Sequence, residues 1–182
     1  MGKIIVYLNR RFCGRTLFCS IKGSFSNQYH NMKVYFAGDH AGFELKKELM
    51  AFVGELGHEV EDCGPLSFDK TDDYPDYVIP MVRKVAGKLS TEVRGIVPAG
   101  SGQGEVIAAN RVPGVRAVVY YGNNPSMVTV SRDHNDSNVM TIGTRFVTLP
   151  DAKEAVRLWL ETPFSNDERH VRRLKKIDSL TR

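Results

Sequence analysis

Short apolar runs alternate with segments of helical periodicity from residue 32 to near the end of the chain. Runs rich in β-branched and aromatic residues predict strands, and apolar positions recurring every three or four residues predict amphipathic helices. The predicted strands are 33–37, 58–63, 95–99, 115–121 and 139–142. The predicted helices are 43–56, 77–89, one starting at 105, one after Pro125, and 151–161. Glycine and proline residues punctuate this pattern, as Gly57 does after the first helix.

This alternation with short links predicts an α/β domain. We expect a three-layer, Rossmann-like fold with a five-stranded parallel sheet, helices on both faces and an extended C-terminal helix. The α/β domain is expected to span 32–164 and the C-terminal helix 165–182. Ligands bind such sheets beyond the carboxyl ends of the strands. Residues capable of chemistry follow three predicted strands, at 38–40, 100–104 and 143–145, so we expect the site along that edge.

The positive charge of the chain is unevenly distributed. The formal net charge is +4, but residues 1–31 hold five Lys and Arg residues and no acidic residue, so the remainder is close to neutral. Neither this stretch nor the basic run 169–176 interleaves aromatic residues as single-strand binding surfaces do, so we expect no nucleic-acid partner. No apolar run approaches the ~20 residues that cross a bilayer, so we expect no membrane partner.

Residues 1–31 are expected to lie outside the fold. The stretch resembles an organellar transit peptide, although sequence upstream of a start at Met32 is the simpler interpretation. Two of the three cysteines lie in it, and Cys63 has no Cys or His at metal-ligand spacing. This usage predicts neither a disulfide framework nor a metal site. It fits a reducing, cytoplasmic setting, with organellar import as the alternative if the leader is genuine.

The segment Ala99-Gly-Ser-Gly-Gln-Gly-Glu105 lies between a predicted strand and a predicted helix. Glycines at alternate positions let the backbone turn tightly and direct its N–H groups at an anion, and the helix start adds positive dipole charge. Such a loop can hold a phosphate or stabilise an oxyanion that forms during a reaction. The pattern is neither the dinucleotide fingerprint nor the P-loop. A tight turn without a ligand remains the alternative.

Three residues near strand or helix ends could transfer protons. Glu105 begins the predicted third helix, where it is either an acid favoured by the dipole or a general base beside the oxyanion site. His134, in Arg132-Asp-His-Asn135, ends the fourth predicted helix, and His40 follows Asp39 after the first strand. Each histidine is either a favourable charge or a proton-transfer group. We expect Glu105, the loop amides and the imidazole of His134 to face one small cavity.

Arg169 and Arg173 are four residues apart and so share one face of the predicted C-terminal helix. A solvated charged face is the ordinary interpretation, but two guanidiniums on one face also match a phosphate monoester. Together with Arg145 they would form a phosphate clamp, for which the helix would have to reach a neighbouring subunit.

Five segments, in this order, carry a resemblance to a known family. They are Tyr35–Lys46, Asp62–Gly64, Asp73–Pro75, Gly100–Glu105 with Ile107–Asn110, and Arg132–Asn135. The chain resembles ribose-5-phosphate isomerase B, in a family that also contains galactose-6-phosphate isomerase subunits, over residues 33–173. Many members carry a catalytic Cys before the Gly-rich loop, where this chain has Ala99. Glu105 matches the branch whose base is a glutamate, and Cys63 lies at the end of a different strand.

The resemblance implies an aldose–ketose isomerase that interconverts ribose 5-phosphate and ribulose 5-phosphate through an enediolate, without metal or cofactor. The implied catalytic residues are Glu105 as base, His134 as ring-opening acid, and Ser101, which stabilises the enediolate together with the loop amides. The implied substrate contacts are Asp39, His40, Gly100, Ser101, Gly102, Gln103, Gly104 and Asn135, with Arg145, Arg169 and Arg173 on the phosphate. The last two arginines would come from the partner in a homodimer, and a tetramer is the alternative. Tyr74 and His170 receive no firm role.

Several other functions stay open or are disfavoured. Galactose 6-phosphate, allose 6-phosphate or a tetrose phosphate could replace the pentose, and a non-catalytic sugar-phosphate-binding protein could keep the phosphate clamp. A nicotinamide-dependent oxidoreductase needs G-x-G-x-x-G after its first strand, and a signalling receiver domain needs an Asp where this chain has Ala99-Gly100. The presence of both Glu105 and His134 favours turnover.

Overall fold

One parallel sheet forms the centre of the molecule, in a computed structural model that describes residues 31–180. Apart from Asn31, the predicted leader lies outside the described residues. The strands are β1 (Lys33–Phe36), β2 (Glu59–Asp62), β3 (Val93–Ala99), β4 (Ala117–Tyr120) and β5 (Val139–Gly143). Their order is β2-β1-β3-β5-β4, so the chain changes direction across the sheet between β1 and β3. The predicted five-stranded parallel fold is confirmed.

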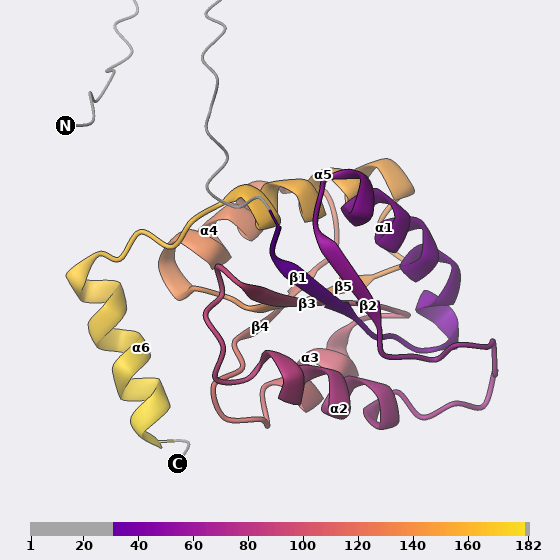
Figure 1. The fold of residues 1–182 in the computed structure, drawn as a ribbon, viewed down its shortest axis with the longest axis horizontal. Coiled ribbons are helices and arrows are strands. Elements are labelled where there is room, and N and C mark those ends of the chain that lie inside the picture. The colour runs from indigo at the N-terminus through magenta and orange to yellow at the C-terminus, as the bar shows by residue number, and fades with distance from the viewer. Residues whose placement is uncertain (1–30, 181–182) are drawn as a thin grey trace, which may run out of the picture.

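Helices cover both faces of the sheet (Figure 1). They are the short 3-10 helix η1 (His40–Gly42), α1 (Phe43–Glu55), α2 (Pro75–Val85), α3 (Gln103–Ala109), α4 (Ser126–Asn135), α5 (Leu149–Glu161) and α6 (Glu168–Leu180). α1, α4 and α5 pack on one face, and α2 and α3 on the other. The C-terminal helix α6 stands beside the body, next to α4, and belongs to neither layer (Figure 1).

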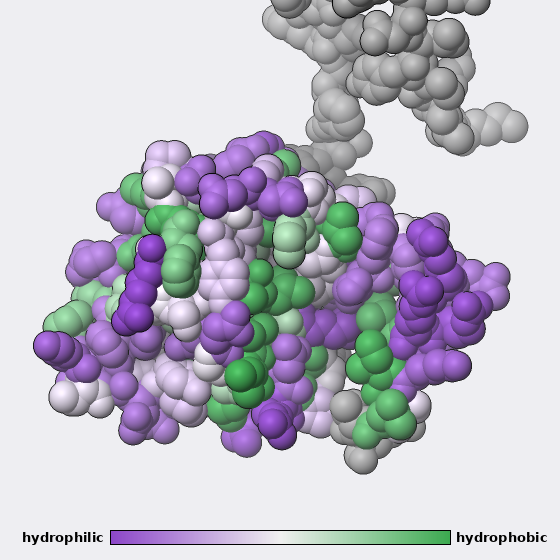
Figure 2. Space-filling view, turned by 180° about the vertical axis from the view of Figure 1, so that it is seen from behind, coloured by the Kyte–Doolittle hydropathy of each residue, from purple (hydrophilic) through white to green (hydrophobic). Residues whose placement is uncertain are grey.

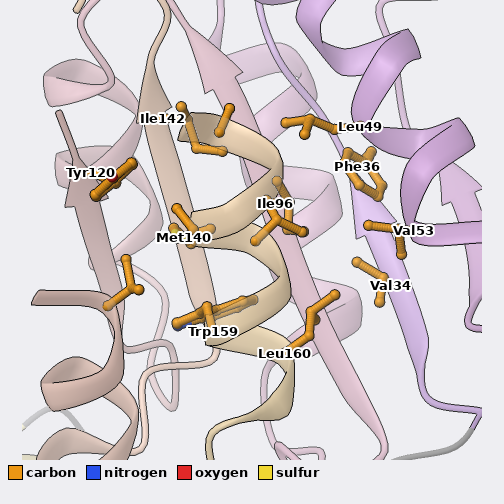
Figure 3. Close-up of a cluster of buried hydrophobic side chains, with 14 of the residues drawn as sticks. Val34, Phe36, Leu49, Val53, Ile96, Tyr120, Met140, Ile142, Trp159 and Leu160 are labelled. Carbon is orange, nitrogen blue, oxygen red and sulfur yellow. The ribbon is translucent and has the colours of Figure 1, made fainter. Parts of the chain in front are cut away.

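Two apolar clusters hold the layers together. The larger lies between the sheet and the layer of α1, α4 and α5, and includes the fully buried Phe36, Ile96, Met140 and Trp159 (Figure 3). The smaller lies under α2 and α3 and includes the fully buried Val97. Burial of apolar surface on both faces fixes the strands in place, and with them the loops at the two edges of the sheet.

Observed helix boundaries differ from the predicted ones by a few residues. α2 starts at Pro75 rather than at residue 77, because proline is well suited to the first turn. It ends at Val85 rather than at residue 89, and the chain turns at Gly87, which has a φ of +72°. Within residues 31–180, no helix combines the length and apolar character needed to cross a membrane.

Pro98 lies in the central strand β3, where a residue without an N–H is unusual. The pairing of β1 with β3 ends at Phe36 and Ile96. The carbonyl of Ile96 accepts from Ala37, so Pro98, two residues later, also faces the β1 side but lies beyond the end of β1. The proline therefore removes no ladder hydrogen bond, and β1 and β3 part at this point.

Candidate active site

The three loops predicted to carry the site meet at the carboxyl edge of the sheet. The backbone N–H groups of Thr144 and Arg145 donate to the carbonyls of Ala99 (2.9 Å) and Gly100 (3.3 Å). The Thr144 hydroxyl donates to the carbonyl of Ala41 (3.3 Å). These bonds join the loop after β5 to the Gly-rich loop and to η1. The prediction that the segments after the first, third and fifth strands lie together is confirmed.

Two glycines let the loop after β1 pack directly on the end of β3. A Cβ atom on Gly42 would lie 1.9 Å from the carbonyl oxygen of Pro98, and one on Gly38 would lie 2.7 Å from it. No side chain fits at either position without moving the backbone. The Asp39 carboxylate accepts from the Gly42 N–H (2.8 Å) and caps η1. Asp39 and His40 are therefore fixed next to the start of the Gly-rich loop.

The Gly-rich loop turns sharply at Gly102, whose φ of +72° lies in the left-handed region. The Thr141 hydroxyl donates to the Gly102 carbonyl (3.0 Å), and the Gln103 side-chain amide donates to the hydroxyl of Tyr121. The Ser101 hydroxyl accepts from the backbone N–H of Gln103 (3.3 Å). Contacts from β5 and from the end of β4 thus hold the loop, as expected of a preorganised oxyanion site.

Glu105 lies in the first turn of α3 and is only 4 % exposed. Burial raises the pKa of its carboxyl group above the ordinary 4.5, and the nearby Asp39 carboxylate raises it further, while its own backbone amide opposes the shift. Within residues 31–180, Glu105 has no salt-bridge partner. A desolvated carboxylate without a cation is a stronger base than an exposed one, as proton abstraction from carbon requires.

Arg145 and Tyr74 flank the two ends of the Gly-rich loop. A Cβ atom on Gly100 would lie 3.5 Å from the central carbon of the Arg145 guanidinium, and one on Gly104 would lie 2.7 Å from the Tyr74 hydroxyl oxygen. The exposed Arg145 guanidinium can therefore meet an anion at the loop. Tyr74, which received no firm role from the sequence, is a neighbour of the site.

Asp72 is a site neighbour that the sequence analysis missed. Its Oδ1 atom lies 2.6 Å from Nδ1 of His40 and accepts from the His40 backbone N–H at 3.2 Å. The two residues are 32 positions apart, and Asp72 sits in a polar loop with other acidic residues. Only the path of that loop could have identified it.

His134 and Asn135 lie at the opposite edge of the sheet from Glu105. α4 ends at Asn135 and β5 begins at Val139, so both residues are near the amino ends of the strands. Glu105 follows the carboxyl end of the seven-residue β3, which spans about 20 Å. The expectation that Glu105 and His134 face one cavity is therefore wrong for a single chain. The reason is that each helix of a βα unit runs from the carboxyl edge of the sheet back to its amino edge. Glu105 lies at the start of one such helix, α3, and His134 at the end of the next, α4, so the two residues are at opposite edges.

A second cluster of predicted site residues surrounds His134. His134, Asn135 and Arg173 line a hollow of about 220 Å³ together with His170. The rings of His134 and His170 lie 4.3 Å apart, and His170 is 3 % exposed. The neighbouring Arg169 is exposed on α6. The structure thus groups the ring-opening acid and two phosphate-binding arginines implied by the resemblance, away from the Gly-rich loop.

The segment from Ser165 fastens α6 to the end of α4. The backbone N–H and the hydroxyl of Ser165 both donate to the carbonyl of Asp133, at 3.0 and 2.8 Å. The same hydroxyl lies 3.1 Å from Nδ1 of His170. α6 and the last turn of α4 therefore present their side chains as one unit.

Asp136 supports the last turn of α4 from behind. Its φ of +45° is unusual for a residue with a side chain, and its carboxylate pairs with Arg116 (2.6 Å) and Arg132 (2.9 Å). Arg116 also donates to the carbonyl of Asn135 (3.1 Å). These charge-assisted bonds fix the helix end that carries His134.

Comparison with known proteins finds relatives over most of the chain. Residues 34–177 match the family model described as Ribose/Galactose Isomerase. The ribose-5-phosphate isomerase B of Escherichia coli (strain K12) is 42 % identical over 149 residues, covering 81 % of this chain and 95 % of that protein. The protein of the same name from Mycobacterium tuberculosis (strain CDC 1551 / Oshkosh) is 41 % identical over 144 residues, covering 79 % and 86 %.

A solved structure adds a ligand. The crystal structure of ribose-5-phosphate isomerase B from Mycoplasma genitalium with bound ribulose-5-phosphate aligns with a TM-score of 0.76 at 34 % identity, covering 82 % of this chain and 95 % of that one. Sequence motifs, fold and relatives agree, and the chain belongs to the ribose/galactose isomerase family.

Proposed function

We propose that this chain is an aldose–ketose isomerase that interconverts ribose 5-phosphate and ribulose 5-phosphate. The relatives named above support this substrate, and the observation that carries the chemistry is Glu105. It is a buried carboxylate with a raised pKa and no cationic partner in residues 31–180, immediately after a loop of directed amides.

Glu105 acts as the base in the isomerisation. It removes the proton from C2 of the open-chain aldose and returns it to C1, so its carboxylate ends the cycle as it began. The proton on O2 is passed to O1 by Ser101 or a nearby side chain, which completes the ketose. The Gly-rich loop and Ser101 stabilise the negative charge on the enediolate oxygens. Loop contacts from Thr141 and Gln103 keep the amides in place, so little reorganisation accompanies the charge as it forms.

Recognition of the sugar falls to the loop after β1, where Asp39 and His40 are packed against β3. The phosphate is held by Arg145 beside Gly100 and by Arg169 and Arg173 on α6. Phosphate binding positions a small, flexible sugar by contacts remote from the reacting carbons, and that binding energy is used in catalysis.

A second copy of the chain completes each site, because His134, Asn135, Arg169 and Arg173 lie too far from Glu105 of their own chain. In a two-fold dimer, the α4–α6 end of one protomer meets the carboxyl edge of its partner, and two complete sites result. His134 of one protomer then assists opening of the furanose held by the other.

The surface around α6 supports this assembly. An apolar groove of about 340 Å³ runs between α6 and the body, lined among others by Val112, Val115, Leu174 and Ile177. Ile177 is 53 % exposed, and Figure 2 shows apolar surface on the side of α6 that faces the body. A helix that stands off with an open apolar stripe is expected to be covered by another chain. We expect the enzyme to act in the cytoplasm.

The direct test is turnover of ribose 5-phosphate by the purified chain, with proton exchange at C2 followed by NMR in heavy water. Galactose 6-phosphate, allose 6-phosphate and a tetrose phosphate serve as competing substrates. We expect exchange and ketose formation with ribose 5-phosphate at the highest kcat/KM. Absence of exchange with every sugar phosphate would refute the isomerase.

A further inference from the structure

Within residues 31–180, the hydrogen bonds of the Asp72 carboxylate all go to His40. Its side chain is 1 % exposed, while that of His40 is 33 % exposed. Oδ1 of Asp72 receives both the backbone N–H and the Nδ1 group of His40. Oδ2 is buried and has no hydrogen-bond partner within residues 31–180. A buried carboxylate oxygen without a donor costs stability, so the fold alone gives little reason for a carboxylate here.

The loop that carries Asp72 is anchored before it and after it. At its start, the fully buried Lys46 donates to the Asp62 carboxylate (2.6 Å) and to the carbonyl of Pro65 (2.7 Å). At its end, Tyr74 packs against Gly104 of the Gly-rich loop. Asp72 is thereby presented to His40 by a loop that also borders the proposed site.

The contact determines which nitrogen of His40 carries a proton. A carboxylate only accepts hydrogen bonds, so Nδ1 at 2.6 Å must donate, and in the neutral ring Nε2 is left as the acceptor. The His40 backbone is fixed as well, because η1 packs on Pro98. The ring edge meets Phe68 at 6.4 Å between centroids, which limits rotation of the side chain.

We infer that Asp72 is a positioning residue that holds His40 as the Nδ1–H tautomer, so that Nε2 accepts a hydrogen bond from a hydroxyl of the sugar phosphate. The inference rests on the proposed function for its substrate, but its structural part concerns the ring of His40 alone. An imidazole free to adopt the other tautomer would present an N–H to the hydroxyl and would lose this hydrogen bond in part of the molecules.

The first test reads the tautomer in the wild-type chain. Nitrogen-15 NMR of the histidine rings, with His40→Gln to assign the His40 signals, should show Nδ1 protonated and Nε2 unprotonated in the neutral ring. A neutral ring protonated at Nε2 would overturn the inference. This measurement needs no activity, so it remains decisive if ribose 5-phosphate is not the substrate.

The second test measures turnover of Asp72→Asn. Its amide can donate to Nδ1 and so allows the other tautomer, and we expect kcat/KM to fall about 10- to 100-fold, as loss of a hydrogen bond to a charged group does. Asp76→Asn removes the same charge from an exposed position in the first turn of α2 and should stay within about twofold. Wild-type kcat/KM in Asp72→Asn, with a folded chain by circular dichroism, would refute the positioning role. An inactive wild-type chain would instead refute the proposed function.

Discussion

The proposed site has two halves that are built by different means. The carboxyl-edge half holds the Gly-rich loop and Glu105, and the amino-edge half holds His134 with Arg169 and Arg173. At the carboxyl edge, loops are held against the sheet by backbone contacts, such as Gly42 on Pro98, and the proposed base Glu105 is buried. At the amino edge, helix ends present exposed side chains such as Arg169 and Arg173, and Ser165 joins α6 to the last turn of α4. Proton transfer at carbon needs a fixed, desolvated group, whereas a dianionic phosphate can be bound by long, solvent-exposed arginine side chains.

Glu105→Gln removes the base from the carboxyl-edge half and leaves the amino-edge half intact. We expect kcat to fall by about 10²–10⁴-fold or more, because the amide has nearly the same shape but cannot accept the proton. Binding of the substrate should stay within several-fold, since recognition lies in other residues. Steady-state kinetics and calorimetric titration measure the two quantities, and full activity in this variant would remove Glu105 from the mechanism.

Mixing two inactive variants tests whether the halves come from different chains. Glu105→Gln and His134→Ala each spoil both sites of their own homodimer. After denaturation and refolding of an equal mixture, heterodimers should regain one intact site, and total activity should reach about a quarter of the wild-type value. If both residues of a site belonged to one chain, the mixture would stay at the level of the separate variants.

Arg173→Ala weakens the amino-edge half alone. Loss of a charged contact to the phosphate should raise KM about 10- to 100-fold and lower kcat far less, because the reacting carbons are remote from it. Arg172→Ala is the matched control, since Arg172 is also exposed on α6 but does not line the hollow beside His134. An unchanged KM in Arg173→Ala would mean that the substrate phosphate does not bind at Arg173.

The smallest expected effect is a pH-dependent change in thermal stability on replacing Glu105. It depends on the burial of this carboxylate, so the exposed arginines should not show it. A carboxyl group whose pKa is raised by folding contributes stability below its ordinary pKa of 4.5, and this contribution is lost as the pH rises through the folded value. Glu105→Gln should therefore melt a few degrees above the wild type at pH 7.5 and close to it at pH 4. An equal difference at both pH values, by thermal unfolding, would mean that ionisation of Glu105 does not cause it.

Much of the carboxyl-edge half could be predicted from the sequence, because strand ends and glycine spacing are local signals. The Gly-rich loop, Glu105 and the loop with Asp39 and His40 lie where periodicity and the rule for parallel sheets indicated. Cys63, predicted as the last residue of the second strand, comes directly after β2, and burial raises the pKa of its thiol. Local patterns sufficed here.

The amino-edge half could not be placed in the same way. His134 lies in the last turn of a helix rather than after a strand, and the periodicity says nothing about which copy of the chain its side chain serves. His170 was left without a role, although its ring contacts that of His134. The position of Asp72 beside His40 depends on the course of a long loop, which no periodic pattern determines. Contacts between segments that are far apart in the sequence, such as that of Asp72 with His40, could therefore not be predicted.

Pro98 has a consequence for how far the pairing of β1 with β3 can extend. Because Pro98 has no N–H, a longer β1 would have a backbone carbonyl without a donor on β3. The pairing of these two strands therefore cannot extend further toward the proposed site. The glycine-bearing turn fills that gap with backbone alone. A single imino acid thus sets where the pairing of β1 with β3 ends and where the loop carrying Asp39 and His40 begins to pack on β3.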